Sequence, residues 1–145
     1  MPRQQTQKVI NESSVNDADS EGYTDLMRAV ENNDIKKVKQ FLTIKGIDLE
    51  IMTDDSEYPE YGHTALSIAT YKNNYEIVKL LIEKGANKNH KARNDIEIFD
   101  NVGYSSGRCS TVFETILEMA TRIGNQDIIY FYKKNTYIKK HFILL

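Results

Sequence analysis

The sequence predicts a mostly α-helical fold: a solenoid of stacked helix-turn-helix units with β-turn or hairpin fingers between them. Three segments of the 145-residue chain align in register at several positions. Each segment spaces its apolar residues as one face of a helix does, and each has a turn signal near its middle. Repeats of this kind form elongated folds in which neighbouring units bury a continuous core.

A threonine that can cap a helix begins each unit. Thr24, Thr64 and Thr115 each precede an apolar helical stretch. A threonine at that place accepts a hydrogen bond from an otherwise unpaired N–H of the first turn. Aligning these three residues brings four further columns into register: Leu26, Leu66 and Leu117; Ala29, Ala69 and Ala120; Asp34, Asn74 and Asn125; Val38, Val78 and Ile129.

A turn and a second helix complete each unit. The pairs Asn32-Asn33, Asn73-Asn74 and Gly124-Asn125 interrupt the apolar pattern where a tight turn between helices is needed. Apolar residues at helical spacing follow each pair. Gly46 and Gly85 are placed to end the second helices of the first two units as left-handed caps.

The three segments resemble ankyrin repeats, whose unit is a β-turn plus two helices with a T-P-L-H-x-A signature. The second segment carries Gly62-His63-Thr64-Ala65-Leu66 and ends in Glu83-Lys84-Gly85-Ala86-Asn87. The first segment adds the lead-in Asp19-Ser20-Glu21-Gly22-Tyr23-Thr24. The resemblance implies an ankyrin-repeat domain over residues 19–136, with repeats at about 20–50, 60–90 and 111–136.

The units depart from the family signature at several positions. The signature Pro is replaced by Asp25, Ala65 and Ile116, and the signature His by Met27, Ser67 and Glu118. The third unit has Phe113 in place of the lead-in Gly. Its Thr111 and Glu114 have the spacing of a capping box, which would start the first helix about one turn early.

Two insertions lengthen the fingers. The spacing between the aligned threonines exceeds the usual repeat of about 33 residues in both intervals. The first insertion, about residues 53–61, is acidic and rich in tyrosine. The second, about residues 90–110, alternates apolar and charged residues before two glycines, which predicts a longer hairpin.

The two ends of the chain lie outside the repeats. Residues 1–18 hold too few apolar side chains to offset chain entropy, so we expect a disordered polar tail. Residues 137–145 are expected to fold back and cap the apolar face of the last unit. The alternative is an exposed apolar patch for a partner or a second copy.

Composition argues against several classes of protein. A net charge of −2 argues against nucleic-acid binding, which requires a concentrated basic surface. A single cysteine cannot form an internal disulfide. The sequence has no apolar run of about 18 residues for a membrane span and no apolar stretch typical of a signal peptide near its start. We therefore expect a cytoplasmic protein without membrane contact.

Catalytic and metal-binding motifs are weak. His63, His90, His141 and Cys109 share no metal-ligand spacing, and the acidic loop 54–60 lacks the EF-hand pattern. A site in the 90–110 insertion that uses Cys109 and a histidine stays open as an alternative, in an enzyme or a regulator. We expect no enzyme activity, no cofactor and no metal.

The resemblance implies that the chain binds an unidentified partner protein, as a monomer, through its concave face and fingers. Aligned finger and first-helix positions give the candidate contact residues: Tyr23, Glu31, Asn32, Tyr58, Tyr61, His63, Tyr71, Lys72, Glu114 and Arg122. Tyrosine and arginine are frequent anchors of interfaces. A self-associating module that uses the C-terminal tail is a further alternative. The Ile-, Asn- and Lys-rich composition suits an AT-rich genome, such as that of an intracellular bacterium or a large DNA virus. Proteins of this family in such organisms often face host proteins, so by analogy with the family, delivery into a host cell stays open beside a cytoplasmic location.

Overall fold

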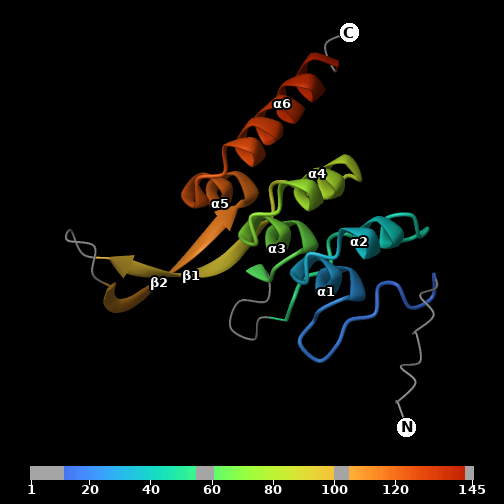
Figure 1. The fold of residues 1–145 in the computed structure, drawn as a ribbon, viewed down its shortest axis with the longest axis horizontal. Helices are drawn as coiled ribbons and strands as arrows, with labels where there is room; N and C mark the ends of the chain where they lie inside the picture. The colour runs from blue at the N-terminus through green and yellow to red at the C-terminus, as the bar shows by residue number, and fades with distance from the viewer. Residues whose placement is uncertain (1–11, 55–60, 100–104, 143–145) are drawn as a thin grey trace.

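The computed structural model describes residues 12–54, 61–99 and 105–142. This part of the chain is mostly helical, with six helices and a small two-stranded sheet (Figure 1). The helices are α1 (Asp25–Glu31), α2 (Ile35–Phe41), α3 (Ala65–Tyr71), α4 (Tyr75–Glu83), α5 (Ile116–Ile123) and α6 (Gln126–Phe142).

The helices form three pairs arranged in two rows. Helices α1, α3 and α5 contact one another in order, and helices α2, α4 and α6 form the second row. Each first helix also packs against the second helix of its own unit. We call α1, α3 and α5 the first-helix row. Its members bring the same aligned position of successive units side by side.

The predicted helix starts are confirmed. The side chains of Thr24, Thr64 and Thr115 accept hydrogen bonds from the backbone N–H three residues later, each at 3.3 Å. Asp34, Asn74 and Asn125 cap the second helices in the same way. Each of these bonds satisfies a donor that the helix itself leaves unpaired.

The turn before each second helix also repeats. Asn33 and Asn73 adopt left-handed backbone with φ of 56° and 58°, and Gly124 takes that place in the third unit. Asparagine tolerates this conformation better than most residues. Side chains also join successive turns: Asn74 donates to the Asn33 amide oxygen, and Asn125 donates to Asn73. We call these four asparagines the asparagine ladder.

Most of the aligned apolar positions are buried. Leu26, Leu66, Val38 and Val78 are almost inaccessible, as are the three aligned alanines. Leu117 in the third unit is only half-buried. A further helix pair follows each of the first two units, whereas no described unit follows the third. The core of the third unit is built instead by Ile116, Met119 and Ile128.

The second insertion is a long hairpin, as predicted. Strand β1 (Lys91–Phe99) pairs antiparallel with β2 (Ser105–Thr115), and the hairpin projects away from the helices in Figure 1. Because Lys91 is paired with Thr115, the strand continues to the start of α5.

The capping box expected at Thr111 and Glu114 is therefore wrong. Both residues lie in β2, and the box is formed by Thr115 and Glu118. Glu118 accepts from the Thr115 N–H at 2.8 Å. The two boxes have the same spacing, and strand pairing decides which of them forms.

The disordered tail expected over residues 1–18 ends earlier in the structure, because residues 15 and 16 pack against the first unit. Val15 is 1% exposed and belongs to the core. The Asn16 side chain donates to the Gly46 carbonyl and accepts from the Asp48 N–H, both at 2.8 Å. These partners lie 30 or more residues away, so residues 15–16 pack on the end of the first unit.

The C-terminal stretch continues α6 instead of starting a separate segment. The helix runs from Gln126 to Phe142, and Figure 1 shows it extending past α4. At its start, the Phe131 ring meets Tyr75 edge-on at 6.0 Å between ring centroids. Tyr132 lies 4.9 Å from the Lys88 ammonium. The capping role of residues 137–145 stays a prediction.

Candidate protein-binding surface

Three equivalent residues lie along the first-helix row. Glu31, Tyr71 and Arg122 each stand seven positions after the capping threonine of their unit. Because α1 contacts α3 and α3 contacts α5, these positions follow one another across the row. Their side chains differ in charge and in how firmly the chain itself holds them.

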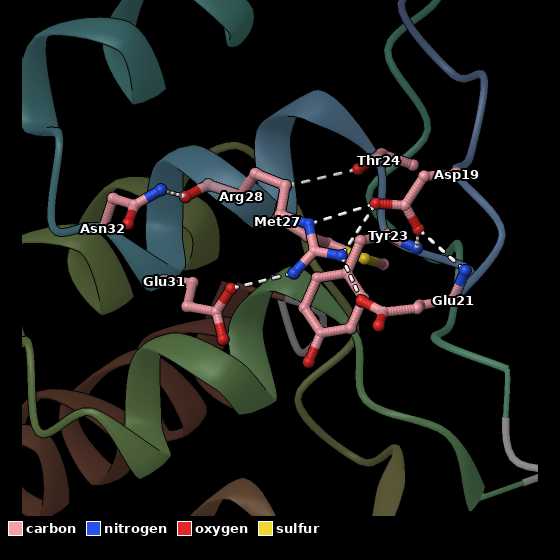
Figure 2. Close-up of polar contacts among 8 residues, drawn as sticks. All are labelled: Asp19, Glu21, Tyr23, Thr24, Met27, Arg28, Glu31 and Asn32. Atoms are coloured by element: carbon pink, nitrogen blue, oxygen red, sulfur yellow. Dashed lines mark hydrogen bonds and ion pairs between the residues drawn. The ribbon is translucent and has the colours of Figure 1, made fainter.

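In the first unit, Arg28 of α1 bonds residues of the lead-in stretch Asp19–Tyr23, which we call the first finger. Its guanidinium bonds Asp19 at 2.8 Å, Glu21 at 2.5 Å and Glu31 at 3.2 Å, as Figure 2 shows. It also lies 3.9 Å from the centroid of the Tyr23 ring. We call Arg28 and these four residues the Arg28 cluster. Three carboxylates surround a single cation, so the cluster is net negative.

The electrostatics of this cluster follow from that arrangement. The hydrogen bond from Arg28 holds the pKa of Asp19 below its ordinary value, and backbone N–H groups of Tyr23 and Glu21 act in the same direction. The hydrogen bonds that Arg28 donates to Glu21 and Asp19 raise the pKa of the arginine. Burial raises the pKa of the Tyr23 phenol, and the Glu31 charge adds to that effect. Asp19 and Arg28 are therefore both charged at neutral pH.

Sequence reasoning did not identify Arg28. The spacing of Arg28 and Glu31, three residues apart on one helix, was an available signal. The pairing with Asp19 and Glu21 depends on how the finger folds back. Asn32, which the sequence did single out, donates from its amide to the Arg28 carbonyl at 2.8 Å and helps to end α1.

In the second unit, Tyr71 presents a large aromatic ring on the first-helix row. Its side chain is 56% exposed, and the neighbouring Lys72 is also exposed. Tyr71 borders a surface hollow of about 300 Å³ that is also lined by His63, Arg93, Asn94 and Asp95. We call the stretch around His63 that leads into Thr64 the second finger. The hollow lies where the end of α3 meets this finger and β1.

His63 is half-buried. Its Nδ1 lies 3.3 Å from the Ser67 hydroxyl, which donates to the Thr64 carbonyl. The main chain of His63 pairs with Thr53 through two bonds of 2.9 Å. His63 therefore helps to build the finger in which it lies. Ser67 occupies the place of the signature His and is fully buried.

In the third unit, Glu114 holds Arg122. The two side chains form paired bonds of 2.7 and 2.8 Å, and the Asn94 amide donates to the same carboxylate at 3.2 Å. Glu114 is only 9% exposed. It therefore fixes the position of the Arg122 side chain but has little accessible area for contact with a partner. The bond from Arg122 to Glu114 raises the pKa of the arginine, which stays charged.

The remaining finger candidates lie apart from this row. Tyr61 is half-buried, and its ring centroid lies 4.4 Å from that of Phe113 in β2. This contact connects the second finger to the hairpin. Tyr58 lies outside the described residues.

Within residues 12–54, 61–95 and 110–135, no three His, Cys, Asp or Glu side chains are placed to hold a metal ion. The His90 Nε2 lies 2.7 Å from the Gly62 carbonyl. The Cys109 side chain lies outside the described part, so the alternative site in the insertion stays a hypothesis. No described helix combines the length and the apolar character that crossing a bilayer needs.

Comparisons with known proteins agree with the repeat pattern. A family model for ankyrin repeats, in three copies, matches residues 4–92. A curated ankyrin repeat protein of Rickettsia bellii (strain RML369-C) is 29% identical over 102 residues. That alignment covers 70% of this chain and 14% of the relative. A second, of Rickettsia felis (strain ATCC VR-1525 / URRWXCal2), is 39% identical over 82 residues, covering 56% of this chain and 25% of the relative.

The chain thus spans a quarter or less of the length of these two relatives. The family match ends in β1, before the third unit. The structure carries the pattern further, because Thr115 and Asn125 cap α5 and α6 as their counterparts cap the earlier helices. The matched repeats and the repeated caps lead to one conclusion: the chain belongs to the ankyrin-repeat family.

Proposed function

We propose that this chain binds a partner protein, without catalysis, through the concave face that the first-helix row and the fingers form. Ankyrin repeats are generally protein–protein interaction modules and are generally not enzymes. One observation carries the proposal further. Tyr71 is widely exposed at the middle of the row, while its counterparts Glu31 and Arg122 are held by ion pairs within the chain.

These ion pairs support the proposal by fixing charges in place. Arg28 ties Glu31 to the first finger, and Glu114 ties Arg122 to β2. Side chains that are already ordered lose less entropy when a partner binds, so more of the contact energy is retained as affinity. The Arg28 cluster adds a net negative region at the N-terminal end of the row. Complementary charge on a partner would speed its encounter with this face.

Tyr71 is the anchor of this proposal. A tyrosine offers a large apolar ring and a hydroxyl at a small entropy cost, which is why it is frequent among the residues that dominate binding energy. The hollow beside it offers room for a partner side chain next to the ring. Lys72 and His63 lie at the margins of this contact area.

The proposal is tested by affinity capture with matched variants. Tyr71→Ala removes the proposed anchor, while Tyr130→Ala removes an even more exposed tyrosine, at 69%, from the second row. In lysate of the native cell, we expect the unmodified chain and Tyr130→Ala to enrich the same protein, and Tyr71→Ala to lose it. Both variants should unfold with a free energy within about 0.5 kcal/mol of that of the unmodified chain, as is usual for surface substitutions.

Equal enrichment by all three chains would contradict binding through Tyr71. Tyr23 is also a candidate contact, but Tyr23→Ala would remove the ring beside Arg28 and disturb the stretch from Asp19 to Tyr23 that Arg28 holds. A cytoplasmic location and delivery into a host cell stay predictions.

A further inference from the structure

We propose that a second surface hollow, between the interhelical turns of the first two units, binds a proline-rich segment of a partner in the polyproline II conformation. This hollow has a volume of about 380 Å³, and we call it the turn hollow. Tyr71 lines the other hollow. The inference therefore does not rest on the role proposed for Tyr71, and a separate experiment tests it.

Two asparagine side chains supply hydrogen-bond donors to the turn hollow. Asn33 and Asn73 line it and are exposed. The Asn33 amide oxygen accepts from Asn74, and the Asn73 amide oxygen accepts from Asn125. Among the described residues, neither the Asn33 nor the Asn73 side chain donates a hydrogen bond. The asparagine ladder thus engages the two oxygens and leaves two NH2 groups to donate to a ligand.

The interval between these donors matches a polyproline II helix. Asn33 and Asn73 hold the same turn position in units whose first helices are in contact, and packed helices lie about 8–10 Å apart. A polyproline II helix has about three residues per turn and rises about 3.1 Å per residue, so carbonyl groups three residues apart face the same way at about 9 Å. In a β-strand, carbonyl groups three residues apart point to opposite edges.

Apolar groups in the turn hollow suit the rings of prolines. Tyr75 lines the hollow, is 38% exposed and meets the Phe131 ring edge-on. An aromatic ring that a neighbour already holds loses little entropy when a ligand packs on it. Ile35 adds a half-buried aliphatic side chain. Proline-rich segments dock against aromatic side chains in this way, because their helix is formed before binding.

The charges of the turn hollow favour a neutral ligand. Glu31 and Lys72 line it with one negative and one positive side chain, so these two charges balance. Arg28 holds the Glu31 carboxylate at 3.2 Å, while the Lys72 ammonium is a further donor for a carbonyl oxygen. Proline has no backbone N–H. A run of prolines therefore presents acceptors to these donors and buries no main-chain donor that needs a partner.

A fluorescently labelled decaproline peptide tests the proposal on the full chain, with a glycine–serine peptide of equal length as the matched probe. Fluorescence anisotropy should show binding of decaproline alone. Asn33→Gly and Asn73→Gly each remove one donor and keep the left-handed backbone, because glycine adopts positive φ freely. Each should raise the dissociation constant about fivefold, as expected for one lost hydrogen bond. Tyr75→Ala should raise it about tenfold or more.

Gln40→Ala is the control, since it removes an exposed amide from α2 at a position outside the turn hollow. Both Gln40→Ala and Tyr71→Ala should bind decaproline as the unmodified chain does. Circular dichroism should show the same helix content for every variant. Equal binding of the two peptides, or no binding of decaproline, would overturn the proposal. So would unchanged binding by both glycine variants, because the peptide would then use another surface.

Discussion

Arg28 illustrates how one residue fixes the first finger. Its planar guanidinium bonds two finger carboxylates and a helix carboxylate while lying against the Tyr23 ring. Arginine suits this task because it has five donors in a fixed geometry. The same residue determines where charge is presented at the N-terminal end of the row.

Arg28→Ala should lower the thermal transition at neutral pH, because three carboxylates lose their common cation. The pKa of Asp19 is lowered in the folded chain, so its contribution is present above the unfolded pKa of about 3.9. That contribution is lost as pH falls through the folded value. Thermal unfolding of variant and parent should therefore differ at pH 7 and converge in acid. A difference that does not change with pH would contradict this account.

Two glycines, Gly22 and Gly62, precede the first helices of the first two units at places where the backbone is crowded. Gly22 has φ of 77°, and a Cβ there would lie 2.2 Å from the Asp54 backbone nitrogen. At Gly62 a Cβ would lie 2.2 Å from the Thr53 carbonyl oxygen. The chain before the second finger therefore passes too close for any side chain. Phe113 is tolerated in the third unit because that position lies within β2.

Gly22→Ala should destabilise the fold more than Gly46→Ala does. Gly46 has φ of 81°, but a Cβ there would meet nothing within 4 Å. Gly46→Ala should therefore cost only the backbone strain of about 1–2 kcal/mol. Gly22→Ala adds a clash with backbone that cannot move away cheaply. Urea denaturation of both variants measures the two losses in the free energy of unfolding. Equal losses would contradict the close contact between Gly22 and the Asp54 backbone.

At the scale of elements, the same cap starts each first helix. Helices of seven or eight residues are too short to be stable by propensity alone, so caps and packing must define them. Thr64 is almost fully buried at the start of α3, the central helix of its row. Its hydroxyl accepts from the Ser67 N–H in a place that water reaches poorly.

Thr64→Ala should lower the free energy of unfolding by about 1 kcal/mol, within the range of 0.5–2 found for lost caps. Thr64→Ser keeps the hydroxyl and should retain most of that stability. Chemical denaturation of the two variants makes the comparison. Equal losses from Ala and Ser would assign the effect to the lost methyl group and contradict the capping role.

The sequence predicts these elements well because caps and turns depend on near neighbours. The aligned threonines, alanines and Asn or Asp residues predict the six helices that the structure describes. The alternation of apolar and charged residues in the second insertion predicts the hairpin. The Arg28 cluster, the burial of Glu114 and the docking of Asn16 depend on residues brought together by the fold. Asn16 and its partner Gly46 are 30 positions apart. Local pattern carries no direct signal for such contacts.

At the scale of the whole molecule, successive units are joined by repeated polar contacts as well as by the core. The asparagine ladder joins the turns of all three units. Lys39 of α2 bonds Glu76 of α4 at 3.0 Å, and Glu50 accepts from the Asn87 N–H at 2.8 Å. In repeat proteins, stability is approximately the sum of unit terms and nearest-neighbour terms. These contacts contribute to the neighbour terms and keep the first-helix row in register.

The most direct test of the central claim is a titration of the purified, captured partner into the chain and its two tyrosine variants. Loss of an anchor residue costs about 2 kcal/mol, which corresponds to roughly a thirtyfold rise in the dissociation constant. Calorimetry should show that rise for Tyr71→Ala and no change for Tyr130→Ala. An unchanged constant for Tyr71→Ala, or a rise for Tyr130→Ala alone, would contradict binding through the first-helix row.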